Sequence, residues 1–246
     1  MIAGSAPTTG EWAPAHSPVV IGVDGSEGSR SALAWAAAEA TRAGADLRLV
    51  AIADENPLSP RFPVLLNRSH ARKVLDALAG SIAGDFPEEQ LATELYEGEA
   101  TTKLLDHLDH ARMLVVGKRG LGVIPRMLVG STSLAVAGRS PVPVAVVPTG
   151  WHPDDHLTEP VVLGVDPTRT GGHLMHLAFR RAERLGVPLV AVHGWEAPSA
   201  LWVDSPVDEW EREAHEQFLT VLAPWTRRFQ EVELRTVTSS HHPAVA

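Results

Sequence analysis

The sequence predicts an α/β protein: a doubly wound, five-stranded parallel sheet with helices on both faces, repeated in tandem. In the first part of the chain, short apolar runs alternate with helix-forming segments, as in parallel sheets whose strands are buried on both faces. The segment that starts at Val19 also matches the segment that starts at Val161 without a gap. The same offset places Gly44 on Gly186. A repeat of this length indicates two copies of one structural unit.

The elements of the first copy follow from the spacing of its apolar residues. Apolar or alternating segments predict strands at 18–23, 46–53, 89–97, 112–117 and 142–148. Helical spacing predicts helices at about 64–83 and at 27–44 and 100–111. Gly44 stands where a helix stop is expected, and Gly130-Ser131 is expected to open one more helix. Strand and helix therefore alternate along the copy.

The repeat also sets the expected domain boundaries. We expect a flexible leader at 1–17, a first domain at 18–148, a linker at 149–159 and a second domain at 160–246. The second copy stops after its third strand, so we expect it to be C-terminally truncated and degenerate as a ligand site. A sheet that stopped there would leave an apolar edge exposed unless a partner covered it.

Composition excludes several classes of function. Of the 246 residues 44% are hydrophobic, and the formal net charge is −9 with no cluster of Lys or Arg, which disfavours nucleic acid and anionic membrane surfaces as partners. There is no cysteine for disulfides or thiolate zinc sites. No apolar stretch is long enough to span a bilayer, and the polar N-terminal segment lacks the features of a signal peptide. We therefore expect a cytoplasmic location.

Two loops that follow strands carry unusual residues. One is Asp24, Gly25 and Ser26 after the first strand, and the other is the glycine-rich stretch 117–131. In a doubly wound sheet, ligands bind beyond the carboxyl ends of the strands, where the strand order reverses. These loops are therefore the expected ligand site. Asp24 has a structural alternative, which is to cap the helix at 27–44.

The glycine-rich stretch has the properties of a phosphate cradle. Without a Cβ, Gly117 would let another molecule lie against the backbone at the strand end. Gly120 and Gly122 allow positive φ, so that consecutive amides converge on an anion. Gly130 precedes a helix whose free N–H groups and dipole suit a phosphate, and Ser131 could both cap that helix and donate to a phosphate oxygen.

Other motifs and clusters fit less well. The Walker pattern GxxxxGK[ST] and the dinucleotide pattern GxGxxG are both absent. The "DGSEG" segment at 24–28 misses the nucleophile elbow GxSxG by its first glycine. The cations near the cradle (Lys118, Arg119 and Arg126) either steer phosphates or are simply solvated. The histidine pairs His173 and His176, and His241 and His242, lack the further ligands of a metal site, so we interpret them as surface residues.

These motifs together resemble the universal stress proteins. ATP-binding members of that family carry Gly, two residues, Gly, nine residues, then Gly-Ser or Gly-Thr, and Gly117, Gly120, Gly130 and Ser131 meet this spacing. The segments "VVIGVDGSEGSRSALAWAAAEA" and "SPVPVAVVP" are similar to the family's opening strand and helix and to its closing strand. The resemblance implies the adenine nucleotide alpha hydrolase-like version of the fold, and it covers nearly the whole chain.

The resemblance also implies roles for individual residues. Asp24 would contact the ribose or a metal, Ile52 would line the adenine, and Gly117 would approach the ribose. The phosphates would be held by Gly120, Gly130 and Ser131. The full set of expected nucleotide-binding residues is Asp24, Gly25, Ser26, Ile52, Gly117, Arg119, Gly120, Gly122, Arg126, Gly130, Ser131 and Thr132.

Two classes of function follow from this interpretation. The first is a stress or signalling module that binds ATP, with Mg²⁺ as a candidate companion ion, and hydrolyses it slowly if at all. The second is an enzyme of the same fold group, a slow ATPase or a transferase of adenylate or phosphate, which would need an acceptor site and a positioned base or cation. Because the family often dimerises through its closing strand, we also expect a homodimer through 142–148.

Overall fold

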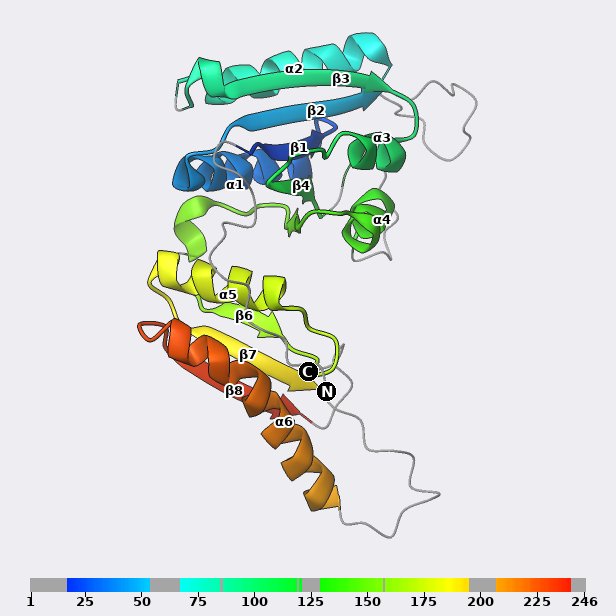
Figure 1. Cartoon of the computed structure of the whole chain (residues 1–246). Helices are drawn as coiled ribbons and strands as arrows, with labels where there is room; N and C mark the ends of the chain where they lie inside the picture. The colour runs from blue at the N-terminus through cyan, green and yellow to red at the C-terminus, as the bar shows by residue number, and fades with distance from the viewer. Residues whose placement is uncertain are drawn as a thin grey trace. The chain divides into compact units, whose positions relative to one another are not determined.

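The computed structural model describes residues 17–53, 67–84, 86–118, 120, 129–156, 158–194 and 207–239. The chain divides into two compact units with the boundary between Asp155 and His156, and the elements of each unit can be followed in Figure 1. Apart from Ser17, the expected leader lies outside the described residues. No helix in the described ranges is both long and apolar enough to cross a bilayer.

The first unit contains the predicted five-stranded sheet, with the order β3-β2-β1-β4-β5 and parallel pairing throughout. Its strands are β1 (Val19–Val23), β2 (Leu47–Ala53), β3 (Leu91–Glu97), β4 (Met113–Gly117) and β5 (Val144–Val147). Its helices are α1 (Glu27–Ala43), α2 (Arg68–Ile82), α3 (Ala100–Asp106) and α4 (Ser131–Arg139). The strand order reverses between β1 and β4, which is the arrangement of a doubly wound sheet.

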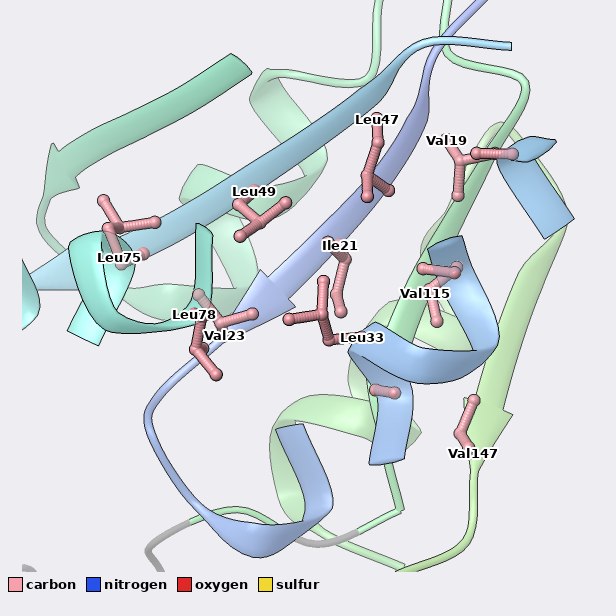
Figure 2. Close-up of a cluster of buried hydrophobic side chains, with 14 of the residues drawn as sticks. Val19, Ile21, Val23, Leu33, Leu47, Leu49, Leu75, Leu78, Val115 and Val147 are labelled. Carbon is pink, nitrogen blue, oxygen red and sulfur yellow. The ribbon is translucent and has the colours of Figure 1, made fainter. Parts of the chain in front are cut away.

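Helices cover both faces of this sheet. Helices α1 and α2 pack on a cluster that includes Ile21 and Leu49; Figure 2 shows this cluster, with Leu33 of α1 turned toward the strand side chains. Helices α3 and α4 cover the opposite face, over Val20 and Val50. Successive strand residues point to opposite faces, so each buried strand supplies both clusters. The predicted fold class is confirmed for this unit.

Both copies end their first helix in the same way, at the predicted stop. Gly44 follows α1 with φ 60°, and Gly186 follows its counterpart with φ 64°. The amides of Ala45 and Val187 donate to the carbonyls of Ala40 and Ala182 respectively. This left-handed termination favours glycine because it lacks a Cβ. The repeated glycine is therefore a structural residue in each unit.

The predicted helix at 100–111 is too long. Helix α3 ends at Asp106, and His110 then adopts φ 60°. The apolar spacing continues past the helix because Leu108 and Ala111 are also buried, although in a turn closed by the Ala111 amide and the Leu108 carbonyl. That turn brings Arg112 to the start of β4, where its amide donates to Pro18. Tertiary packing therefore overrides the local helical pattern.

Two other predicted boundaries also move. Helix α2 begins at Arg68, because the Asn67 side chain accepts a hydrogen bond from the His70 amide at 2.8 Å and caps it there; residues 64–66 lie outside the described ranges. Residues Glu88–Gln90, at the start of the predicted strand 89–97, form a single 3-10 turn (η1) before β3. Asn67 is a preferred N-cap residue, and Pro87, which precedes the 3-10 turn, is a residue favoured in turns.

The second unit shows the repeat in part. It has a parallel sheet of order β6-β7-β8, made of β6 (Val161–Gly164), β7 (Leu189–Gly194) and β8 (Leu234–Ser239), with helices α5 (Gly172–Leu185) and α6 (Val207–Arg228). Both helices contribute to one buried cluster. Val162 on the other face is 65% exposed, whereas its repeat counterpart Val20 is 1% exposed. This face of the described part of the sheet is therefore only partly covered, because Val190 and Val192 beside it are half-buried.

The beginning of the expected linker packs on the first unit. The Gly150 amide donates to the Ser31 hydroxyl of α1 at 3.0 Å, and Trp151 packs against the cluster under α1 and α2. Glycine at 150 is required by the turn, since its φ is 82°. This contact fixes the chain where it leaves β5.

Candidate functional site

Two loops of the first unit meet where the strand order reverses. Strands β1 and β4 are parallel neighbours in the sheet, so the chain leaves both at the same side, where the carboxyl ends of the strands lie. A Cβ added to Gly120 would lie 2.3 Å from Oδ2 of Asp24, which shows how closely the two loops approach. The structure therefore brings the first loop and the start of the glycine-rich stretch together.

The loop after β1 is organised by its own side chains. Oδ1 of Asp24 accepts a hydrogen bond from the Ser26 amide at 3.0 Å, and Gly25 between them has φ 81°. Ser26 is the N-cap of α1, because its hydroxyl oxygen accepts a hydrogen bond from the Ser29 amide at 3.1 Å. The alternative that Asp24 caps this helix is therefore wrong. Asp24 instead shapes the loop and places its second oxygen over Gly120.

The space beside Gly117 is filled by the protein. A Cβ at this position would lie 2.7 Å from the backbone carbon and oxygen of Gly28 in the first turn of α1. The expectation that the missing Cβ leaves room there for another molecule is therefore wrong. Glycine is needed at 117 because the end of β4 and the start of α1 approach each other backbone to backbone.

Helix α4 begins beside the carboxyl end of β4, and its N-cap residue is a glycine. Its N-cap is Gly130, with φ −63° and ψ 150°, and no side chain of the described residues is seen to cap the helix. The expectation that Ser131 caps the helix is wrong, because Ser131 is its first residue and is exposed to solvent. Thr132 follows and is half-buried. The first amides of a helix carry partial positive charge, so this end of α4 is suited to an anion.

The ends of the glycine-rich stretch are fastened to each other and to the sheet. The Gly130 amide donates to the Lys118 carbonyl at 2.8 Å, and the Lys118 amide donates to Val147 of β5 at 2.6 Å. The Ser133 hydroxyl donates to the Gly117 carbonyl at 2.7 Å. Ser133 was missed from the sequence, where the only signal was a small polar residue in the first turn of the helix.

The family is decided by comparison with known proteins. Residues 16–148 match the family model described as "Universal stress protein family". A universal stress protein of Mycolicibacterium smegmatis is 30% identical over 240 residues, which span 92% of this chain and 80% of that protein. The chain belongs to the universal stress protein family.

Solved universal stress proteins resemble this one in fold. One from Archaeoglobus fulgidus matches 93% of this chain and 80% of its own, with 14% identity and a TM-score of 0.55. Another, solved in complex with cAMP, is 26% identical, covers 56% of this chain and 100% of its own, and has a TM-score of 0.44. The Archaeoglobus comparison supports the α/β fold.

Ile52 lies at the carboxyl end of β2 in this universal stress protein. It is half-buried beside the cluster under α3 and α4, and it pairs in register with Tyr96 of β3. The Tyr96 ring stacks on His107 with 3.7 Å between centroids. Burial, together with the hydrogen bond to Glu94 and its negative charge, raises the pKa of Tyr96 to about 12. A stacked aromatic pair, with an uncharged Tyr96, therefore borders Ile52.

A third loop at the carboxyl edge carries an ionised carboxylate. Glu99, which follows β3, caps α3 by accepting hydrogen bonds from the amides of Thr101 and Thr102. Desolvation by burial raises the pKa of Glu99, but these bonds and one from the Thr102 hydroxyl outweigh it and lower the pKa to about 2. Its oxygens already have partners, so we assign Glu99 to helix capping.

Three of the expected site residues cannot be placed in the structure. Arg119, Gly122 and Arg126 lie outside the described residues. Within the described ranges, no three His, Asp or Glu side chains gather in a group that could hold a metal ion. The described part of the site therefore consists of the Asp24 loop, Gly117, Lys118, Gly120 and the start of α4.

The second unit has a different arrangement at the corresponding edge. Asp166 accepts hydrogen bonds from the hydroxyl and amide of Thr168, which lower the pKa of this carboxyl. Helix α5 starts only at Gly172, after the uncapped Gly171. At the end of β7, His193 is buried, lies 2.9 Å from the Val165 carbonyl and contacts Phe218.

One histidine of the second unit was misassigned to the surface. His176 is half-buried, with its ring edge-on to Trp225 and Phe229. Burial, and then the positive charges of Arg228 and Arg180, lower its pKa. His173 is exposed as expected, while His241 and His242 lie outside the described residues. His176 therefore belongs to the packing between α5 and α6.

Proposed function

We propose that this universal stress protein binds ATP at the carboxyl ends of β1 and β4, where the strand order of the first unit reverses. The observation that carries the proposal is the N-terminus of α4, which follows a glycine N-cap, has no side-chain cap from the described residues, and starts close to the end of β4. Free amides and the helix dipole are suited to phosphate. The family membership of the chain and the approach of Asp24 to Gly120 support the same position.

The residues present fit an adenine nucleotide with its phosphates at α4. The amides of Ser131 and Thr132, with their hydroxyls, are the proposed donors to the phosphates. The Asp24 carboxylate is the proposed contact of the ribose or of a Mg²⁺ ion, which it could ligate as an oxygen donor. Ile52 is the proposed apolar neighbour of the adenine, and Arg119, Gly122 and Arg126 are proposed to complete the phosphate site.

We favour a binding and signalling role over turnover. Of the described residues in the two meeting loops, Asp24 is the only carboxylate, and activating a water or acceptor requires a positioned base beside a cation for the developing charge. The alternative is an enzyme of the same fold group. Labelled ATP separates the two: the binding role predicts retention with negligible turnover, and rapid turnover with an acceptor would replace it with the enzyme.

ATP binding is tested directly by calorimetry on the whole chain. We expect ATP to bind more tightly than adenosine, because only ATP reaches α4. Asp24→Asn keeps the loop hydrogen bond to Ser26 but loses the charge, so ATP should bind about tenfold more weakly. Asp166→Asn, the matched change in the second unit, should have no effect because we propose that unit is degenerate for ATP. Absence of heat with millimolar ATP would refute the proposal.

We also propose that two copies of the chain pair through β5. This strand is at the edge of the sheet. The carbonyls of Pro143 and Val147 accept hydrogen bonds from β4 and the residue after it, so strand alternation directs the backbone groups of Val144 and Val146 outward. Val146→Pro removes one outward amide and should give a monomer that still binds ATP. Light scattering measures this, and a monomeric wild type would exclude the dimer.

A further inference from the structure

The end of β4 is held from two sides by groups of the first unit. On the α1 side, the backbone of Gly28 fills the position that a Cβ of Gly117 would take. On the α4 side, the Ser133 hydroxyl donates to the Gly117 carbonyl at 2.7 Å. The last residue of β4 is thus fixed relative to both helices, and one of them begins at the proposed phosphate position.

Ser133 makes the tertiary contact that fixes the first turn of α4. The residue is only 6% exposed, and the bond from its hydroxyl joins the helix to β4 rather than to another part of the helix. Because its hydroxyl is directed at Gly117, Ser133 does not cap the helix, and in the described part of the chain α4 keeps an N-terminus without a side-chain cap. A side chain without a hydroxyl would leave the Gly117 carbonyl without this donor.

The other hydrogen bond near the start of α4, from Gly130 to Lys118, cannot substitute for that of Ser133. The bond from the Gly130 amide to the Lys118 carbonyl closes the base of the glycine-rich stretch, but it acts on the N-cap residue. It fixes where the helix starts, and the buried Val136 packs the later part of the helix on the sheet, but neither contact is made by a side chain of the first turn. The Ser133 bond, made within the first turn, fixes the direction in which the first amides point.

We propose that Ser133 is a positioning residue that holds the N-terminal amides of α4 in place for the nucleotide phosphates. This inference rests on the proposed ATP site and adds a residue that does not itself contact the ligand. Binding donors are effective only when they are held in the productive geometry, because mobile donors must be ordered on binding. Ser133 supplies that order before the ligand arrives.

The test compares two serines at opposite ends of one helix. The Ser140 hydroxyl donates to the Val142 carbonyl at 2.7 Å just after the C-terminal end of α4. Ser140→Ala therefore removes a similar bond at the end of the helix away from the phosphates. Calorimetry on the full chain with ATP and with adenosine, beside thermal unfolding of each variant, separates positioning from general stability.

We expect Ser133→Ala to weaken ATP binding about tenfold, the loss of roughly one buried hydrogen bond, and to leave adenosine binding unchanged. Ser140→Ala should bind both ligands like the wild type. Ser133→Cys, which keeps nearly the same volume and has only a weak donor, should fall between serine and alanine, and it serves if the alanine variant does not fold.

Distinct results overturn the inference and the proposed function. If the wild type binds ATP and the Ser133 variants bind it equally well, Ser133 is not a positioning residue. The inference also fails if ATP and adenosine weaken together, or if Ser140→Ala has the same effect as Ser133→Ala. If the wild type binds no ATP, the proposed function itself is wrong.

Discussion

Replacing Gly130 with aspartate should weaken ATP binding strongly and leave the protein at least as stable as the wild type. The conformation of Gly130, φ −63° and ψ 150°, is the one that capping residues adopt. An aspartate there would accept hydrogen bonds from the open amides of α4 and complement its dipole, which contributes about 0.3–1 kcal/mol. The same carboxylate would occupy the proposed phosphate position.

The size of the binding loss follows from charge. Two like charges about 4 Å apart repel by roughly 4 kcal/mol near a protein surface, and a tenfold loss of affinity corresponds to about 1.4 kcal/mol. We therefore expect ATP to bind more than about a hundredfold more weakly. Gly130→Asn should show a smaller loss, because its amide can cap the helix without the charge.

A matched control lies in the second unit. Gly171 is the uncapped N-cap of α5, with φ −73° and ψ 155°, and a Cβ there would meet nothing within 4 Å. Gly171→Asp should stabilise its helix in the same way and leave ATP binding unchanged. Calorimetry and thermal unfolding on both variants measure the two effects. Full ATP affinity in Gly130→Asp would place the phosphates away from α4.

The sequence was sufficient for the parts of the fold that depend on local pattern. Buried parallel strands are short apolar runs, so the strands at 18–23 and 46–53 were predicted to within a residue of β1 and β2. The stop at Gly44 was predicted because a left-handed residue favours glycine, and the repeat aligned Gly186 with it. These features are determined by a few neighbouring residues in the sequence.

Features that depend on distant neighbours could not be predicted in the same way. The spacing of Gly117 and Gly120 marked them as important, but it could not show that Gly28 lies beside one and Asp24 beside the other. The role of Ser133 likewise depends on the carbonyl of a residue in a different element. A motif thus indicates where backbones come close without showing which group fills the space.

Burial in the second unit shows the same limit. Val20 and Val162 occupy equivalent positions in the repeat, and local pattern predicts a buried strand residue at both. The first is covered because α3 and α4 lie over its face of the sheet. In the described part of the second unit, α5 and α6 both pack on the opposite face. The same residue in a similar local sequence therefore has a different exposure when the covering elements differ.

The close approach at Gly117 leads to a second large effect, this time on stability. Gly117→Val should destabilise the first unit by about 3 kcal/mol, at the upper end of the usual cost of overpacking. The added Cβ would lie 2.7 Å from the backbone of Gly28, and backbone cannot rotate away as a side chain can. Either α1 or β4 must move, and both flank the proposed ATP site. Gly117→Ala should show a smaller effect of the same kind.

Urea denaturation measures this effect, and Gly164→Val is the control. Gly164 also ends a strand, β6, but a Cβ there would meet nothing within 4 Å. The same substitution should change stability there by less than about 0.5 kcal/mol, as at ordinary surface positions. If Gly117→Val were as stable as the wild type and lost only ATP binding, the space beside Gly117 would belong to the ligand. The packing of α1 against β4 would then not be the reason for glycine at this position.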